Sequence, residues 1–146
     1  MRTRQLLLVI SGFLTLFIAS TLPYDDPVWH HVHLRVPNPG EGAEWYPKYM
    51  EGEARRTSAR FSETTINFIR AEGKFKGSSG SSVDHIGWSF SDLDAKMKEF
   101  EEAGIRILSQ PRSIGLVQYA FIEDPWGTKI EVLQDAEHLG FHHVHI

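Results

Sequence analysis

A short histidine-rich segment occurs three times in this chain, and this internal repeat constrains the fold more than any other feature. The three copies are WHHVHLRV at 29–36, VDHIGWSF at 83–90 and FHHVHI at 141–146. Aligning them places His31, His85 and His143 in register, 54 and 58 residues apart. Because a fixed period of this size indicates one small supersecondary unit per copy, the chain is predicted to contain repeated modules of strands and helix.

The second copy shows the order of elements within a module. Residues 83–90 alternate as a strand, and Ser91 with Asp94 three residues later forms a capping-box pattern that opens a helix. Gly104 stands where that helix should end. Three β runs follow, at 105–109, 115–122 and 128–134, the last two joined by an Asp-Pro-Trp-Gly turn at 124–127. The sequence therefore predicts a βαβββ module over residues 83–135.

The first copy repeats this order over residues 28–73. A strand at 30–36 is followed by Asn38 as a helix N-cap and Pro39 at the first helical position, and β runs are expected near 55–61 and 64–71. Residues 74–82, rich in Gly and Ser, are interpreted as a flexible connector. The fold class predicted from the two modules is α+β.

The third copy, residues 139–146, contains only a first strand. A single strand cannot bury its own apolar face, so we interpret it as the opening of a further module. Its pairing partner is expected either within this chain or in another chain.

Residues 1–22 differ in composition from the rest of the 146-residue chain. Arg2 and Arg4 precede an apolar run from Leu6 to Ala19, and small residues follow at 19–21. This pattern is typical of a secretory signal, while an uncleaved membrane anchor through residues 5–20 is the alternative. We therefore expect an exported protein, periplasmic or secreted, or one anchored to the membrane.

Composition excludes two classes of site. The chain has no cysteine, so thiolate metal sites and disulfides are ruled out. Its net charge of −4 comes without a basic stripe, so nucleic acid is not an expected partner.

The alternation of side chains along strands indicates which residues share a polar face. His31 and His33 lie on the face opposite Val32 and Leu34, and by the same reasoning His85 lies opposite Ile86. A lone strand histidine is usually a surface or satisfied residue, but the shared register singles out His31 and His85. Glu131 faces away from Ile130 and Val132 on the last strand of the second module. Two imidazoles and a carboxylate from strand centres suit a divalent metal with open positions.

The residues VDHI at 83–86 and FIEDPWGTKIEV at 121–132 resemble the signature of the vicinal oxygen chelate superfamily. That superfamily includes glyoxalase I, fosfomycin-resistance and bleomycin-resistance proteins, and extradiol dioxygenases. The resemblance implies two βαβββ modules that form an incomplete barrel around a metal cleft. Position by position, it implies His31, His85 and Glu131 as metal ligands.

The resemblance also implies the chemistry. A divalent metal, with Fe, Mn, Zn, Ni and Co all compatible, would act as a Lewis acid on a small substrate that chelates it through two oxygens. Among the catalytic candidates, His33 is the obvious proton acceptor and Tyr119 is expected to shape the pocket. By analogy with the family, a homodimer is expected.

Departures from the family pattern leave the reaction type open between lyase or isomerase and dioxygenase. Glyoxalase I places a glutamate where this chain has Asn67, and an amide cannot transfer that proton. Dioxygenases usually carry a tyrosine ten residues before the ligand glutamate, where this chain has Phe121 with Tyr119 nearby on the same face. The alternative function is a metal-free, ligand-sequestering protein of the bleomycin-resistance type.

Overall fold

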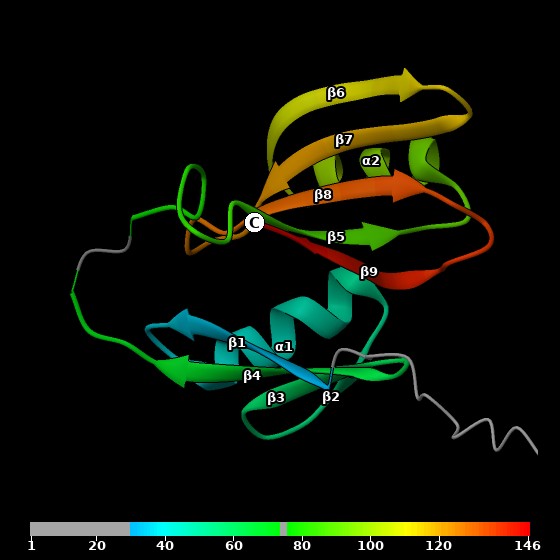
Figure 1. The fold of residues 1–146 in the computed structure, drawn as a ribbon. Coiled ribbons are helices and arrows are strands. Elements are labelled where there is room, and N and C mark those ends of the chain that lie inside the picture. Colours follow the sequence, from blue (N-terminus) through cyan, green and yellow to red (C-terminus); the bar gives the residue numbers. More distant parts are fainter. Residues whose placement is uncertain (1–29, 74–75) are drawn as a thin grey trace, which may run out of the picture.

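The computed structural model describes residues 30–73 and 76–146. In chain order the elements are β1 (His31–Val36), α1 (Pro39–Met50), β2 (Glu53–Ala54), β3 (Ser58–Phe61), β4 (Thr64–Arg70), β5 (His85–Ser89), α2 (Leu93–Glu102), β6 (Arg106–Ile114), β7 (Val117–Glu123), β8 (Lys129–Gln134) and β9 (Gly140–His145). They form two sheets, each with one helix packed on it, and the described residues form no closed barrel (Figure 1). The predicted α+β class is confirmed.

The two sheets have the same internal order, which confirms the repeat. Sheet A runs β1-β4-β3-β2, and sheet B runs β5-β8-β7-β6 with β9 added beside β5. The first strand of each module pairs in parallel with the last, β1 with β4 and β5 with β8. The predicted connector, 74–82, falls between the end of β4 and the start of β5.

The helices begin where short polar side chains can accept from free backbone N–H groups. Asn38 caps α1 by accepting from the Gly40 N–H, and Pro39 occupies the first turn, as predicted. The cap of α2 is Asp92, which accepts from the Ala95 N–H, so the expectation of Ser91 as the cap was wrong by one residue. Both residues can cap a helix, and only the backbone path decides which of them does.

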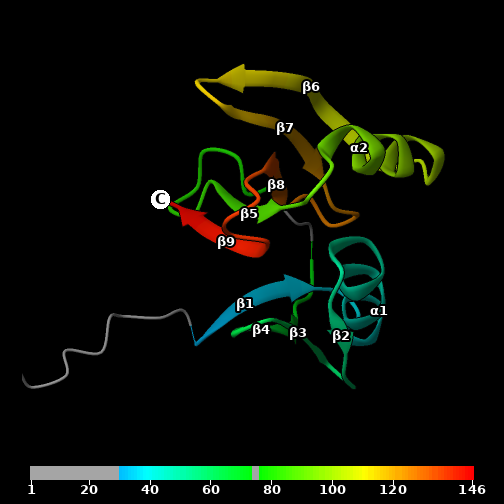
Figure 2. The ribbon, with the colours of Figure 1, turned by 90° about the vertical axis from the view of Figure 1, so that its right-hand side faces the viewer.

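Strand β9 pairs antiparallel with β5, so the third copy of the repeat finds its partner within the chain. It lies along the edge of sheet B that is nearer to sheet A (Figures 1 and 2). Gly87 pairs with His143 but Trp88 pairs with Phe141, so His142 is an extra residue, a β-bulge. The edge of β5 is thereby covered by a copy of the segment that begins β1.

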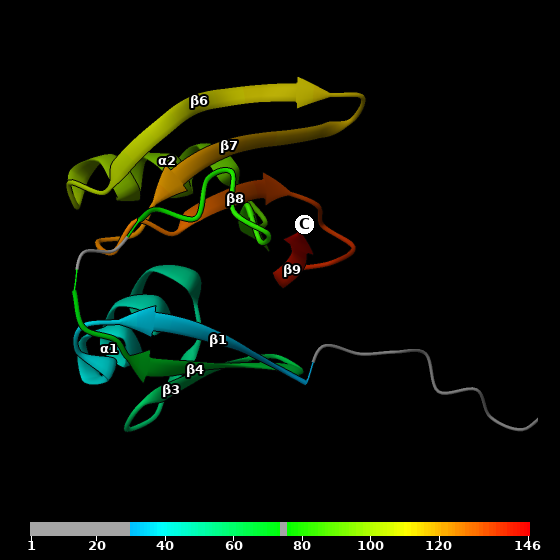
Figure 3. The same ribbon diagram turned by 60° about the vertical axis from the view of Figure 1, so that its left-hand side comes forward.

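One hydrophobic core joins the two modules. The Trp88 ring is fully buried and contacts Tyr46 of α1 and Phe61 of β3. The Tyr46 hydroxyl donates to the buried Asp124 carboxylate at 2.7 Å, across the boundary between modules. Burial and the nearby carboxylate raise the pKa of Tyr46 well above its usual value, so the hydroxyl stays protonated as a donor. Figure 3 shows α1 beneath sheet B, where this bond forms.

The predicted signal or anchor segment, residues 1–22, lies outside the described residues. Among the helices that the structure describes, none is long and apolar enough to cross a bilayer. Export therefore stays a prediction from the sequence.

Candidate metal centre

Three neighbouring strands of sheet B bring one histidine, one glutamate and a second histidine together. Glu131 of β8 and His143 of β9 both stand in register with Gly87 on β5, one on each side. His85 lies two residues earlier on β5 and therefore on the same face of the sheet. This is the face away from the buried side chains Ile86 and Trp88, as the alternation predicted.

The spacing of the three side chains fits one divalent ion. Their nearest ligand atoms all lie within 4.8 Å of one another. Glu131 Oε2 is 3.2 Å from His85 Nε2 and 3.0 Å from His143 Nε2. Ligands about 2.1 Å from a shared ion are separated by roughly 3.0–3.4 Å in octahedral or tetrahedral geometry. The donor types and the two distances to Glu131 would therefore fit a divalent ion.

Gly87 makes room for the third ligand. A Cβ built on this residue would have the nearest three atoms of the His143 ring within 2.8 Å, closer than real Cβ atoms are found to other atoms. Any other residue here would push the ring away from Glu131. The glycine is therefore required by the close approach of His143 rather than by backbone conformation.

A carboxylate orients the first histidine. His85 Nδ1 lies 2.7 Å from Asp84 Oδ1, so an Nδ1–H group that donates there leaves Nε2 free to bind an ion. Lys129 Nζ donates to the same oxygen at 2.8 Å, and the Gly80 N–H donates to the other. The Lys129 ammonium and the Gly80 N–H, together with His85, hold the pKa of Asp84 well below its usual range. Asp84 is thus ionised at any pH at which the imidazole could bind a metal.

A similar series of hydrogen bonds orients the second histidine, His143. His143 Nδ1 lies 2.8 Å from Nδ1 of His142, whose Nε2 lies 3.4 Å from Asp135 Oδ2. With His142 donating to Asp135, its Nδ1 can accept from the His143 Nδ1–H, which again leaves Nε2 free to bind an ion. Both histidines are therefore oriented by groups behind them.

The surroundings of Glu131 favour its charged form. Burial raises the pKa of this carboxyl, but the imidazoles of His143 and His85 outweigh that effect, and the pKa is lowered overall. On the flanks of the site, the Phe121 ring meets the His85 ring edge-on, with 5.2 Å between the ring centroids. The His145 ring stacks on the His85 ring, with 4.4 Å between the centroids. The site is thus partly screened from water, and its carboxylate is ionised.

The structure places the predicted residues as follows. His85 and Glu131 come together, whereas the position expected for His31 is taken by His143. His31 lies exposed on β1 of sheet A, where its ring contacts His30 and His33. Tyr119 contacts Phe121, which separates it from His85 by one ring.

Sequence reasoning missed His143 as a candidate ligand, although the register of the repeat already aligned it with the other two histidines. The missing information was the pairing of β9 with β5, which joins residues 51 to 60 positions apart in the chain. Asp84 was also missed, and its position directly before His85 was the available signal.

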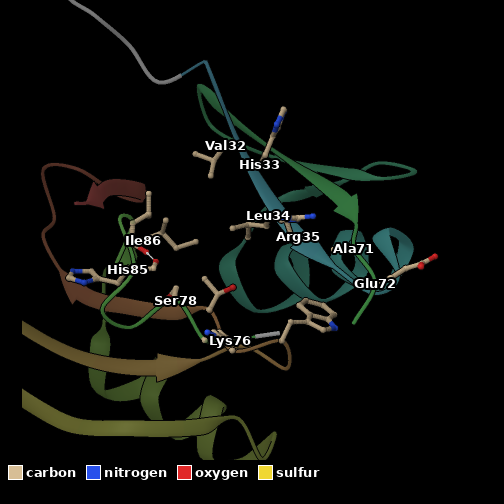
Figure 4. Close-up of a pocket in the computed structure, with 16 residues that line it drawn as sticks. Val32, His33, Leu34, Arg35, Ala71, Glu72, Lys76, Ser78, His85 and Ile86 are labelled. Atoms are coloured by element: carbon tan, nitrogen blue, oxygen red, sulfur yellow. Dashed lines mark hydrogen bonds between the residues drawn. The ribbon is translucent and has the colours of Figure 1, made fainter. Parts of the chain in front are cut away.

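A cavity of about 490 Å³ lies between the two modules. Val32 and Leu34 of β1 point toward Ile86 of β5, whereas the His33 ring points away from them (Figure 4). Lys76, Ser78 and the turn at 126–128 close the end nearest the connector. His33, the predicted proton acceptor, is among the residues that line this cavity, but its ring points away from His85 (Figure 4).

Several solved structures share the fold at low sequence identity. Oxidase ChaP-H1 matches with a TM-score of 0.63 at 12% identity, over 77% of this chain and 98% of its own. Oxidase ChaP-H2 matches with a TM-score of 0.57 at 16% identity, over 75% and 94%. A superfamily member from Sphaerobacter thermophilus matches with a TM-score of 0.58 at 12% identity, over 75% and 98%.

No curated protein matches the chain. Residues 28–132, however, match the family Glyoxalase/Bleomycin resistance protein/Dioxygenase superfamily, and this stretch covers both modules up to β8. The chain belongs to the glyoxalase, bleomycin-resistance and dioxygenase superfamily.

Proposed function

We propose that this protein is a divalent-metal-dependent enzyme that acts on a small substrate with two neighbouring oxygen atoms. The observation that carries the proposal is the convergence of His85, Glu131 and His143 with the spacing of metal ligands. The reaction is of the lyase or isomerase type or of the dioxygenase type. Two imidazoles and one carboxylate accept Fe, Mn, Zn, Ni or Co, so the ligand set does not select the metal.

A bound divalent ion would supply Lewis acidity toward the substrate oxygens. The protein supplies the rest of the site. Asp84 and His142 keep the two imidazoles oriented, and Phe121 and His145 cover the sides of the His85 ring. Three protein ligands leave positions for the two substrate oxygens, which is the arrangement of catalytic rather than structural metal sites.

Proton transfer is assigned to His33. The assignment rests on the sequence, because the His33 ring points away from His85 although both residues line the cavity (Figure 4). The cavity volume of about 490 Å³ is within the range of small-molecule sites. Tyr119 is proposed to shape the pocket indirectly, through the Phe121 ring that it contacts.

The test is a metal count on protein purified without a histidine tag, stripped with a chelator and then reloaded. His85→Ala, Glu131→Gln and His143→Ala are each expected to bind one equivalent less than the wild type. His31→Ala is the matched control, because it removes the histidine at the same position of the repeat, and it should bind as the wild type does. If His31→Ala loses the metal and His143→Ala keeps it, the ligand set proposed here is wrong.

A second candidate function is the sequestering of a small ligand without a metal. The apolar side chains that line the cavity, among them Val32, Leu34 and Ile86, favour it, since an organic molecule could be held there by burial alone. Wild-type protein that takes up no divalent ion would support this candidate. Loss of turnover of oxygen-chelating substrates on removing the metal, with recovery on adding it back, would exclude it.

A further inference from the structure

We propose that Asp135, His138 and His142 form a second binding site for a divalent transition-metal ion, at the turn between β8 and β9. The three side chains offer one carboxylate and two imidazoles whose ligand atoms lie within 4.8 Å of one another. None of them is a ligand in the centre made by His85, Glu131 and His143, although His142 and Asp135 stand behind His143 there. The proposal goes beyond the proposed function and does not depend on it.

The distances within this group are those of ligands around one ion. Asp135 Oδ2 lies 3.1 Å from His138 Nδ1 and 3.4 Å from His142 Nε2. Both separations fall in the range of roughly 3.0–3.4 Å expected for ligands about 2.1 Å from a shared centre. One oxygen therefore stands between two imidazole nitrogens, as Glu131 does at the first centre.

Hydrogen bonds to its backbone and to its carboxylate hold Asp135 in place. The fully buried Ser89 hydroxyl donates to the Asp135 carbonyl and accepts from its N–H, both at 2.8 Å, which fastens Asp135 to β5. The Glu137 N–H donates to Oδ1 at 3.0 Å, so Oδ2 is the oxygen left for an ion. The Glu137 N–H, with His138 and His142, lowers the pKa of Asp135, so the carboxylate is charged. A ligand fixed in this way loses little freedom when an ion binds.

The bulge in β9 gives His142 its direction. It is the extra residue between the pairs Gly87–His143 and Trp88–Phe141, so it is not bound by the alternation of its neighbours. Its imidazole lies toward the turn, within reach of Asp135, and its ring meets that of His138 edge-on at 6.0 Å. The bulge thus supplies consecutive histidines to two different centres.

The donor types indicate the class of ion. Two nitrogens and one oxygen suit Zn, Ni, Co or Cu, whereas Mg and Ca prefer oxygen ligands alone. A hollow beside β9 and the β3–β4 turn is lined by His138, His142 and Glu63, so the site is open to solvent and carries additional negative charge. Water would complete the coordination shell.

The two centres touch through the 2.8 Å contact between His142 Nδ1 and His143 Nδ1. When both rings bind ions through Nε2, both Nδ1 atoms carry protons and this hydrogen bond is lost. The loss of one ordinary hydrogen bond lowers the affinity for whichever ion binds second by about fivefold. That change is small enough for both centres to fill when metal is in excess.

The experiment is a Zn²⁺ titration of the full chain, purified without a histidine tag and stripped with a chelator, with bound metal measured by elemental analysis. The wild type is expected to bind two equivalents, and both His138→Ala and Glu131→Gln should bind one. The double variant should bind none. His30→Ala removes an exposed histidine outside both groups and should still bind two. Circular dichroism checks that each variant is folded.

The outcomes separate this proposal from the proposed function. If His138→Ala keeps two equivalents, or if the wild type binds a single ion that is lost only in Glu131→Gln, there is no second site. A single ion that is lost in His138→Ala but kept in Glu131→Gln would support the second site and overturn the catalytic centre. When Co²⁺ replaces Zn²⁺, each of the two occupied sites should give its own absorption signal. Each single variant should lose the signal of its own site and keep the other.

Discussion

The substitution Gly87→Ala tests the proposed metal centre without removing any of its proposed ligands. The new methyl group would point toward the His143 ring, whose nearest atoms lie within 2.8 Å of the Cβ position. Ordinary contact begins at 3.4 Å and the closest ring atom lies well inside that limit, so the ring must move by about 1 Å. Metal–ligand distances tolerate only about 0.2 Å, and the displaced ring therefore ceases to be a good ligand.

The expected effect on metal affinity is large and the expected effect on stability is small. Disturbing a group that merely orients a ligand costs about 10- to 100-fold in affinity, and displacing the ligand itself should cost at least as much. The His143 ring is partly exposed on an edge strand, so it can swing toward solvent instead of straining the backbone. Alanine also fits a strand better than glycine, by about 0.5–1 kcal/mol, which offsets part of any strain.

The assay compares metal affinity, by competition with a chromogenic chelator, and thermal unfolding of the same preparations. Gly40→Ala is the matched control, because its Cβ would meet Asn38 at an ordinary 3.4 Å in the first turn of α1, and its metal affinity should equal that of the wild type. Wild-type affinity in Gly87→Ala would refute the argument that His143 binds metal in the position seen here. A large loss of stability would show that the ring cannot swing out.

Two further changes test the groups that support the fold and the site. Asp84→Asn should lower metal affinity by about 10- to 100-fold, because it weakens the bond that orients His85, as measured by the same chelator competition. The pKa of Asp84 is depressed in the folded state, so the contribution of this carboxylate to stability is present at neutral pH and is lost as the pH falls below about 4. The difference in Tm between the wild type and Asp84→Asn should therefore shrink below that pH. A difference in Tm that stays constant would contradict the assignment. Tyr46→Phe should destabilise the fold by about 1–3 kcal/mol in urea unfolding, because buried Asp124 loses its hydroxyl donor, while Tyr49→Phe should have a much smaller effect.

The sequence by itself determined the modules and the faces of their strands. The repeat predicted two equivalent units, and the sheet orders confirm them. The alternation around His85 and Glu131 predicted which side chains share the polar face, because a strand has a side-chain period of two whatever its neighbours are. The N-cap at Asn38 was likewise readable, since capping is a contact within a few residues.

Only the tertiary structure decided which histidine joins His85 and Glu131. His31 and His143 occupy the same position in nearly identical segments, so no local property distinguishes them. The choice depends on which strand covers the free edge of β5, and β9 does so, with Gly87 leaving the space for the His143 ring. Strand pairing across this distance in the chain is set by the packing of the whole domain, and it is therefore not encoded in the pattern of either segment alone.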